Sequence, residues 1–546
     1  MSAAARQAIL LLLVLATLGL HDLAAAAPAV AGAGNTYYVR TGGDDGADGR
    51  TLPTAWRSVG RVDQAQLQGG DQVLFEGGST FTGQLYLSPA ESGTPGAPIA
   101  LASYGNQPAT IDGGAGGAFL AYDTAGIAIS NLNFLGAGAG VNGADGVSFY
   151  NDLGGGVKLA YLRISNVDVS GFGRSGIAIG GYNGASGFTD VQVTSSTLHG
   201  NRDNGLISYG PALQPASPSY ANSNFYIAHV SAYDNRGDPG NRLTNSGNGI
   251  VLGSVRAAMV ERSSAWGNGL SCSAPECGAG IWTYDSTAVT IQYCESYANR
   301  AASGRDGDGF DLDQNVSNSY LQYDYSHGND GAGFLDFSRL LNSIHANNTV
   351  RYNVSENDAR TGGGAIALGG VDIGDVLYDN TVFVAAPGGV VATAVGISGA
   401  PSGVTLRNNI FYTTGGLPTI MASALTTAGV LFQQNDYAPS FAAVWGSSVY
   451  TQLDRWREGT GQERIGGRDS GLALNPALAS PGNGGTIGSP DRLATLSAYR
   501  LLPGSPIVNA GLNLQSRFGI DMGGHDFYGV PVPSGSAPDI GASERT

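Results

Sequence analysis

The sequence predicts an all-β fold, a right-handed parallel β-helix in which successive coils of the chain stack into a solenoid. Short segments that end in asparagine recur about every 30 residues through the middle of the chain. Each follows a strand of alternating polarity and leads into a Gly-rich turn and a second short strand, which is typical of strands and turns, not helices. A fixed period with two strands per unit indicates a solenoid, and we expect about 8–11 coils with a cap at each end.

The recurrent asparagines are predicted to occupy one corner of the solenoid. They are Asn201, Asn235, Asn268, Asn299, Asn329 and Asn357. Asparagine adopts the left-handed conformation that a sharp corner needs, and its amides can hydrogen-bond between coils stacked about 4.8 Å apart. Just before this corner, Tyr233, Trp266, Tyr297 and His327 share a column, so we interpret His327 as part of a ring stack. The alternative is that His327 assists the nearby Asp330.

Residues 1–31 have the features of a secretory signal peptide. Arg6 precedes an apolar run over residues 8–20, and an Ala-Val-Ala segment ends at Ala31. The apolar run is shorter than the roughly 20 residues that a membrane-spanning helix needs. We therefore expect a secreted, extracellular protein that has no membrane association after the signal is cleaved.

The two ends of the mature chain resemble those of secreted β-helix proteins of the pectate-lyase-like superfamily. The similar segments are YYVRTGGDDGADGRT and GTPGAPIALASYGNQPATIDGG near the N-terminus, and LALNPALASP and YRLLPGSPIVNAG near the C-terminus. The resemblance implies an N-terminal cap with the first coils over 32–115, a β-helix with an active-site groove over 116–437, and C-terminal coils with a cap over 438–546. A parallel solenoid needs capped ends because its terminal strands expose unpaired edges, and VYTQLDRWREG is predicted to form a short helix over the last one.

The net charge, the cysteine count and the absence of certain motifs exclude some classes of partner and cofactor. The chain has 43 acidic and 27 basic residues, a net charge of −16, which argues against nucleic acid as a partner. No dinucleotide-binding or phosphate-loop motif indicates a nucleotide cofactor. Three cysteines exclude a disulfide scaffold; Cys272 and Cys277 could pair and leave Cys294 free, although three pairings are open. We expect a monomer.

The second strand of each coil is predicted to present chemistry on its outer side. Aligning the coils on the glycine before this strand directs Ile281, Phe310 and Phe334 into the core, because side chains alternate along a strand. The outward positions then hold aromatic and acidic residues, namely Tyr209, Trp282, Tyr284, Asp311, Asp313 and Phe337. Aromatic rings can stack on the apolar faces of sugars while acids bind hydroxyl groups or transfer protons. We predict a sugar-binding groove; the alternative is aromatic side chains packed under a loop.

Asp311 and Asp313 are the candidate catalytic pair. They lie two residues apart on one face, so their Cβ atoms should be about 6.5–7 Å apart. Flexible carboxyl groups at that spacing cover the range of about 5–9.5 Å found for glycosidase pairs. Neighbouring carboxylates beside apolar walls also separate their pKa values, which can supply an acid and a base at one pH. The alternative is two solvated surface aspartates.

A second acidic cluster precedes the same strand and is a candidate calcium site. Asp306 and Asp308 stand in the turn GRDGDGF, Asp330 takes the place of Asp306 one coil later, and Glu276 stands in the turn one coil earlier. Stacked carboxylates repel unless a cation neutralises them, and Ca²⁺ prefers such oxygen ligands. The alternative is ordinary turn chemistry, because Asp-Gly pairs form turns readily.

The segments GDGFDLD and NDGAGF resemble the calcium-dependent family 9 polysaccharide lyases. The resemblance implies that Asp308 and Asp330 bind calcium. In that family a lysine in a later strand acts as the base, but Ala367 stands at the corresponding position here. Arg305 and Arg339 are the basic residues that could contact the substrate in its place, although arginine hardly deprotonates.

These observations predict a secreted enzyme that cleaves glycosidic bonds of a polysaccharide, by hydrolysis with Asp311 and Asp313. A calcium-dependent lyase acting on uronate polymers is the alternative within enzymes. The other alternative is a non-catalytic β-helix protein that binds glycans or acts at the cell surface, built on the same stacked aromatic residues.

Overall fold

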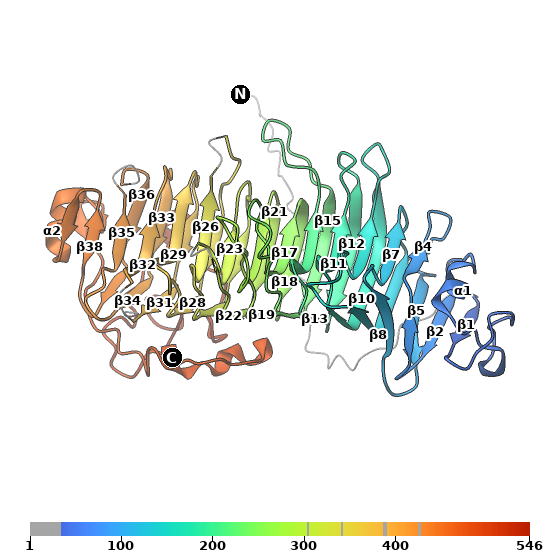
Figure 1. The fold of residues 1–546 in the computed structure, drawn as a ribbon. Helices are drawn as coiled ribbons and strands as arrows, with labels where there is room; N and C mark the ends of the chain where they lie inside the picture. The colour runs from blue at the N-terminus through green and yellow to red at the C-terminus, as the bar shows by residue number, and fades with distance from the viewer. Residues whose placement is uncertain (1–33, 303–304, 340–341, 386–389, 424–426, 546) are drawn as a thin grey trace, which may run out of the picture.

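A computed structural model describes residues 34–302, 305–339, 342–385, 390–423 and 427–545. The proposed signal peptide lies outside this range. The chain forms a long parallel β-helix with three columns of strands, whose coils follow one another from the N-terminal to the C-terminal end (Figure 1). The all-β parallel solenoid that the repeat predicts is therefore confirmed. It has more coils than the 8–11 expected, since one column alone contains 14 strands within the described residues.

One column forms a sheet of 14 strands within the described residues, and we call it the site face. In stacking order its strands are β4 (Leu85–Leu87), β7 (Phe119–Tyr122), β9 (Val147–Tyr150), β11 (Ser175–Gly180), β14 (Asn204–Tyr209), β17 (Asn248–Gly253), β20 (Ile281–Tyr284), β23 (Phe310–Leu312), β26 (Phe334–Ser338), β29 (Gly363–Gly370), β32 (Ala392–Ile397), β35 (Ile420–Ala422), β38 (Ala443–Trp445) and β39 (Ser448–Tyr450). All neighbours pair in parallel except β38 and β39, which form an antiparallel pair at the end.

The other two columns close each coil. The second column contains β1 (Thr36–Val39), β2 (Gln72–Glu76), β5 (Ile99–Tyr104), β8 (Ile127–Gly136), β10 (Lys158–Ser170), β12 (Gly187–Thr194), β15 (Asn222–Ala228), β18 (Val255–Glu261), β21 (Thr287–Gln292), β24 (Tyr320–Gln322), β27 (Thr349–Arg351), β30 (Val376–Tyr378), β33 (Val404–Arg407) and β36 (Val430–Gln433). The third column contains β3 (Thr80–Thr82), β6 (Ala109–Gly114), β13 (Thr197–His199), β16 (Ser231–Tyr233), β19 (Ser264–Trp266), β22 (Glu295–Tyr297), β25 (Tyr325–His327), β28 (Val354–Glu356), β31 (Thr381–Val384), β34 (Ile410–Thr413) and β37 (Asp436–Ala438). The long strands β8 and β10 run through both columns.

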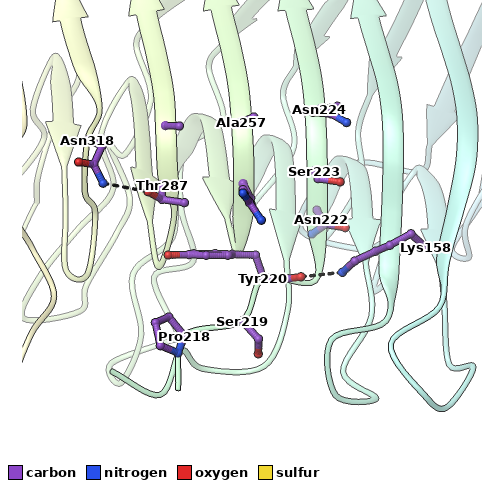
Figure 2. A pocket seen from close by; sticks show the side chains of 12 residues that line it. Lys158, Pro218, Ser219, Tyr220, Asn222, Ser223, Asn224, Ala257, Thr287 and Asn318 are labelled. Atoms are coloured by element: carbon purple, nitrogen blue, oxygen red, sulfur yellow. Dashed lines mark hydrogen bonds between the residues drawn. The ribbon is translucent and has the colours of Figure 1, made fainter. Parts of the chain in front are cut away.

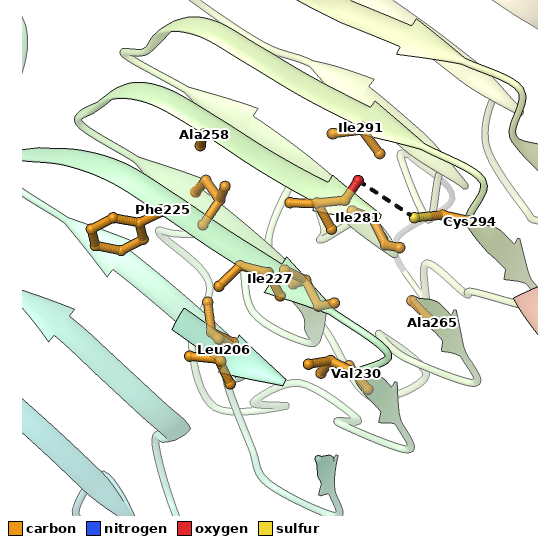
Figure 3. Close-up of a cluster of buried hydrophobic side chains, with 14 of the residues drawn as sticks. Leu206, Phe225, Ile227, Val230, Ala258, Ala265, Ile281, Ile291 and Cys294 are labelled. Atoms are coloured by element: carbon orange, nitrogen blue, oxygen red, sulfur yellow. Dashed lines mark hydrogen bonds between the residues drawn. The ribbon is translucent and has the colours of Figure 1, made fainter. Parts of the chain in front are cut away.

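The interior is a continuous stack of apolar side chains. Residues at equivalent positions lie directly above one another, as Phe310 and Phe334 show with ring centroids 5.3 Å apart and nearly parallel planes. Figure 3 shows the same packing a few coils earlier, where Ile281 and the buried thiol of Cys294 lie among aliphatic residues. Because each coil buries its apolar face only against its neighbours, the stack supplies most of the stabilisation.

The asparagine corner exists, with a register that differs from the prediction. The amides of Asn201, Asn235, Asn268, Asn299 and Asn329 are buried and bond from coil to coil, with Nδ2 to Oδ1 distances of 2.9–3.2 Å. The next member is Asp358, whose Oδ1 accepts from Asn329, and not Asn357. The left-handed residue is the one before each ladder position, as at Gly200 and Asn357. The ladder asparagines therefore form the hydrogen bonds between coils, and the residue before each of them adopts the left-handed conformation of the turn.

A second amide ladder was not predicted. Asn353, Asn380, Asn409 and Asn435 are buried and linked between coils in the same way, and the series ends at the carboxylate of Glu463. The ring stack of the third column is confirmed. His199, Tyr233, Trp266, Tyr297 and His327 follow one another with centroids 4.4–5.6 Å apart.

Both ends of the solenoid are capped. The short segments η1 (Leu52–Thr54) and α1 (Val59–Asp63) lie at the N-terminal end, and α2 (Leu453–Thr460) lies at the other end (Figure 1). Trp456 of α2 is buried against Phe432 and Trp445, which confirms that VYTQLDRWREG contains a capping helix.

The chain beyond α2 adds no coil within the described residues but runs back along the third column (Figure 1). This segment contains β40 (Arg464–Ile465), β41 (Arg468–Asp469), η2 (Pro490–Thr495), η3 (Ser497–Tyr499) and α3 (Leu514–Phe518). Two buried glutamates attach it: Glu295 accepts backbone N–H groups of residues 487 and 488, and Glu356 accepts the hydroxyl of Tyr499 at 2.6 Å. No helix among the described residues has the length and apolarity to cross a membrane.

Candidate functional site

The register of the site face agrees with the sequence alignment of the coils. Ile281, Phe310 and Phe334 are paired in successive strands and lie in the core. The outward position beside them holds Trp282, then Asp311, then Leu335. The next outward position carries Tyr284, Asp313 and Phe337 in β20, after β23 and in β26. The column that we predicted to bear the chemistry is therefore present.

A cavity of about 400 Å³ lies over this part of the site face. It is bordered by the loops that carry Thr244 and Glu276. Six of the predicted site residues line it, namely Glu276, Trp282, Tyr284, Asp313, Phe337 and Arg339. We call it the acidic cavity.

The aromatic lining is held by packing against glycine. A Cβ atom at Gly253 would come within 2.3 Å of the Tyr284 ring, and one at Gly369 within 2.5 Å of the Phe337 ring. Each ring thus packs directly against the glycine of an adjacent coil and is partly exposed. Trp282 is only 6% exposed, and its Nε1 donates to Oδ1 of Asn248 at 2.9 Å. Trp282 therefore supports Tyr284, at 5.4 Å between centroids, more than it offers a face of its own.

Tyr209 belongs to the same column several coils earlier. Tyr122, Tyr150 and Gly180 precede it in register. Its ring contacts the exposed Tyr182 with centroids 5.1 Å apart. Tyr209 is partly exposed but does not line the acidic cavity, so it extends the aromatic stripe away from the acids.

The two candidate catalytic aspartates have different surroundings. Asp311 is 6% exposed, and its Oδ1 has no hydrogen-bond partner among the described residues. Burial raises its pKa well above the usual range, and the nearby Asp313 adds to this effect. Asp313 is half-buried and lines the cavity. Burial raises its pKa to about 6. The hydrogen bond that it accepts from the Gln314 N–H, at 2.6 Å, acts in the opposite direction and lowers the pKa. Asp311 therefore holds its proton to a higher pH than Asp313 does.

Asp306 is a third carboxyl group, which interacts electrostatically with the cavity residues Glu276 and Asp313 but does not line the cavity itself. It is half-buried, and burial raises its pKa to about 7, with further contributions from the negative charges of Glu276 and Asp313. Asp308 is buried, and one oxygen accepts the N–H of Ala332. Its pKa is raised well above the usual range, mainly by burial and then by Asp306. The turn GRDGDGF thus places one accessible and one buried acid next to Asp313.

The four predicted calcium ligands are not arranged as one ligand set. Asp330 forms ion pairs with Arg300 at 3.3 Å and with Arg360 at 3.2 Å. Both oxygens of Glu276 accept from Arg339, at 2.9 and 3.0 Å. Because arginines already neutralise these two carboxylates, the residues fit calcium poorly, and we derive no chemistry from it. Calcium binding stays a prediction.

The candidate basic residues lie at the margin of the site. Arg305 and Arg339 are exposed, and Arg339 is held by its ion pair with Glu276. Ala367 pairs with Leu335 in the site face, which confirms that the coil after Phe337 presents no basic side chain at that position.

A larger cavity of about 850 Å³ lies elsewhere on the solenoid and contains Lys158, the only lysine of the chain (Figure 2). Its ammonium group donates to the backbone carbonyls of Ala185, Tyr220 and Ala221, the last two at 2.6 Å. With all three donors engaged, Lys158 anchors the loop at Tyr220 and is unsuited to act as a base.

Comparison with known proteins agrees with the fold. A family model described as a right handed beta helix region matches residues 145–350. The lacto-N-biosidase of Bifidobacterium longum subsp. longum is 25% identical over 474 residues, which cover 69% of this chain and 29% of that protein. The chain thus spans less than a third of that relative's length.

Two solved structures are also similar. A GH136 lacto-N-biosidase from Eubacterium ramulus has a TM-score of 0.51 and 20% identity, covering 74% of this chain and 68% of the other. Pectate lyase Pel9A has a TM-score of 0.43 and 17% identity, covering 94% and 96%, and is too distant to support an argument. The chain is a right-handed parallel β-helix protein, with the handedness and strand direction that the sequence predicts.

Proposed function

We propose that the protein is a glycoside hydrolase whose active site is the acidic cavity. The observation that carries the proposal is a pair of interacting carboxyl groups with raised pKa values at a cavity lined by aromatic rings. Asp313 lines the cavity, and burial raises its pKa to about 6. Burial and then the charges of Glu276 and Asp313 raise the pKa of Asp306 to about 7. Carboxyl groups whose environments separate their pKa values can act as base or nucleophile and as acid at one pH.

The roles follow from accessibility and charge. Asp313 is the ionised carboxylate that acts as the nucleophile or activates water, and Asp306 is the acid that protonates the leaving oxygen. Asp311, which the sequence pairs with Asp313, is buried and its pKa is raised well above the usual range, so we assign it a supporting role beneath the cavity. Tyr284 and Phe337 provide rings on which a sugar can stack.

The similarity to lacto-N-biosidase supports a carbohydrate substrate with a glycosidic bond. We propose a lacto-N-bioside or a related glycan as the first substrate to examine, and a polysaccharide as the wider class. The disulfide between Cys272 and Cys277 supports export, because such bonds persist in oxidising compartments. Secretion through residues 1–31 is part of this proposal.

The test is an assay on a chromogenic lacto-N-bioside and a panel of polysaccharides, including uronate polymers, with and without EDTA. Reducing ends and absorbance near 235 nm are followed together, because hydrolysis yields only the former and elimination also yields an unsaturated product. We expect reducing ends without unsaturated product.

Unsaturated product that disappears with EDTA would contradict the proposal and indicate a calcium-dependent lyase. Binding of a glycan, measured by affinity electrophoresis, without any cleavage across the panel would instead indicate a non-catalytic glycan-binding protein.

A further inference from the structure

A cluster of three carboxylates and one imidazole is buried inside the solenoid, behind the site face. Asp336 points inward from β26, His345 lies in the turn before β27, and Asp372 and Asp375 lie in the turn between β29 and β30. All four are fully buried, at 0–1% exposure. The ligand atoms of Asp336, His345 and Asp375 all lie within 4.8 Å of one another.

One oxygen of each of the three carboxylates lies within 4 Å of the same nitrogen atom. His345 Nε2 lies 2.7 Å from Oδ1 of Asp336, 3.7 Å from Oδ2 of Asp375 and 3.9 Å from Oδ1 of Asp372. These four side chains come from two successive coils, so the stacking of the solenoid itself brings the atoms together. Ligands bind small cations at about 2.0–2.2 Å. The 2.7 Å contact between His345 and Asp336 is a hydrogen bond that would lengthen slightly around an ion, while the 3.7 and 3.9 Å separations are within the range of two ligands of one ion.

The carboxylates lack the partners that burial demands. Neither oxygen of Asp372 makes a hydrogen bond of normal geometry, and the same holds for one oxygen each of Asp336 and Asp375. Among the described residues, no lysine or arginine forms an ion pair with the three aspartates. When all three carboxyl groups are ionised, one imidazolium at most leaves two negative charges without compensation, and unpaired buried charges are strongly unfavourable.

The hydrogen bonds of His345 show which nitrogen is available. Nδ1 lies 3.1 Å from the backbone carbonyl oxygen of Asp313, to which only a protonated nitrogen can donate. Nε2 faces the carboxylate of Asp336 and the side-chain amide of Asn348, at 3.1 Å. A backbone carbonyl that holds one imidazole nitrogen while the other faces carboxylates is the usual arrangement of a metal-binding histidine.

We propose that Asp336, His345, Asp372 and Asp375 bind one divalent metal ion in the interior of the solenoid. The two positive charges of the ion balance the two uncompensated negative charges of the carboxylates. The ion also supplies the partners that the carboxylate oxygens lack. The nitrogen ligand favours Zn²⁺ or Mn²⁺, because Ca²⁺ prefers oxygen ligands alone. A closed, fully buried set without a route for substrate makes the ion structural. Through His345 it also fixes the backbone at Asp313.

The test measures metal content and thermal stability and does not depend on the proposed hydrolase activity. The full-length protein is stripped with a chelator, incubated separately with Zn²⁺, Mn²⁺ and Ca²⁺, dialysed, and analysed by plasma mass spectrometry. We expect about one equivalent of Zn²⁺ or Mn²⁺ per chain, and a melting temperature that falls by several degrees on chelation and returns with the metal.

Asp372→Asn is the informative variant, because it removes a ligand without removing a hydrogen bond. We expect at least a fivefold loss of bound metal and a melting temperature that no longer responds to chelator. Asp379→Asn is the matched control: Asp379 is also buried without hydrogen bonds of normal geometry but lies outside the cluster, and this variant should retain the metal.

A wild-type protein that binds none of the three ions overturns the proposal, whatever the variants do. Binding of Ca²⁺ alone overturns the choice of a transition metal. An Asp372→Asn protein that keeps its metal overturns the proposed ligand set, because the ion is then bound elsewhere. A variant that is more stable than the wild type shows that protons neutralise the cluster instead.

Discussion

The two cavities of the solenoid differ in a way that locates the chemistry. The larger one contains Lys158 with every donor satisfied by backbone carbonyls. The acidic cavity has about half that volume, yet it is lined by Asp313, whose pKa is raised to about 6. Asp306, whose pKa is raised to about 7, interacts electrostatically with Asp313 from outside the lining. Size alone would favour the first cavity. Partly accessible acids with raised pKa values and nearby aromatic rings favour the second cavity. A reaction needs side chains that are not already held by hydrogen bonds, as Lys158 is.

The largest expected effect is that of Asp313→Asn. The substitution keeps the shape of the side chain but removes the charge that acts as nucleophile or base, so kcat should fall by about 10³-fold or more. Steady-state kinetics on the cleaved glycan measure the loss, and circular dichroism checks the fold. A kcat within tenfold of the wild type would show that the acidic cavity is not the active site.

A smaller loss is expected from removing an aromatic ring. Phe337→Ala takes away one stacking surface, worth about 1 kcal/mol, and should raise KM by roughly fivefold to tenfold with little change in kcat. Tyr182→Ala, outside the acidic cavity, serves as the matched aromatic control. Equal effects of the two variants would indicate that the glycan lies along the tyrosine stripe instead.

The pH dependence should be bell-shaped. Asp313 must be ionised, so activity should fall as the pH drops below about 6, and Asp306 must be protonated, so activity should fall again above about 7. In Asp306→Asn the alkaline limb should disappear along with most of the activity. An unchanged alkaline limb in that variant would assign the acid to another residue.

The smallest effect is expected in the larger cavity. Lys158→Met removes three hydrogen bonds to carbonyls and should lower the free energy of unfolding by about 1–3 kcal/mol. Turnover should stay within twofold of the wild type. A tenfold loss of kcat in a folded Lys158→Met protein would reverse the comparison between the cavities.

Much of the fold could be predicted because its signals are local and repeated. Strand alternation and the glycine before each site-face strand set the register that aligns Trp282, Asp311 and Leu335. The predicted corner ladder is one residue off at its end, because both Asn357 and Asp358 suit a corner. Only the backbone shows that Asn357 forms the turn and that Asp358 accepts the hydrogen bond from the preceding coil. The course of the chain after α2 has no period and could not be predicted.

The site was harder to predict because loops decide it. The period of the strands places Asp311 and Asp313 on the outer side but carries no information on which of them the structure buries. The role of Asp306 depends on Glu276, which belongs to a turn one coil away. The buried cluster around His345 joins Asp336 of β26 to residues from turns outside the repeat, and the sequence signals it only by the two nearby aspartates at 372 and 375.

The most direct measurement is a crystal structure of Asp313→Asn soaked with a glycan that the wild type cleaves. We predict a sugar in the acidic cavity, stacked on Tyr284 or Phe337, with its glycosidic oxygen facing Asp306 and residue 313. A glycan bound only in the cavity beside Lys158 would contradict the account, because the carboxyl groups could not then reach the bond.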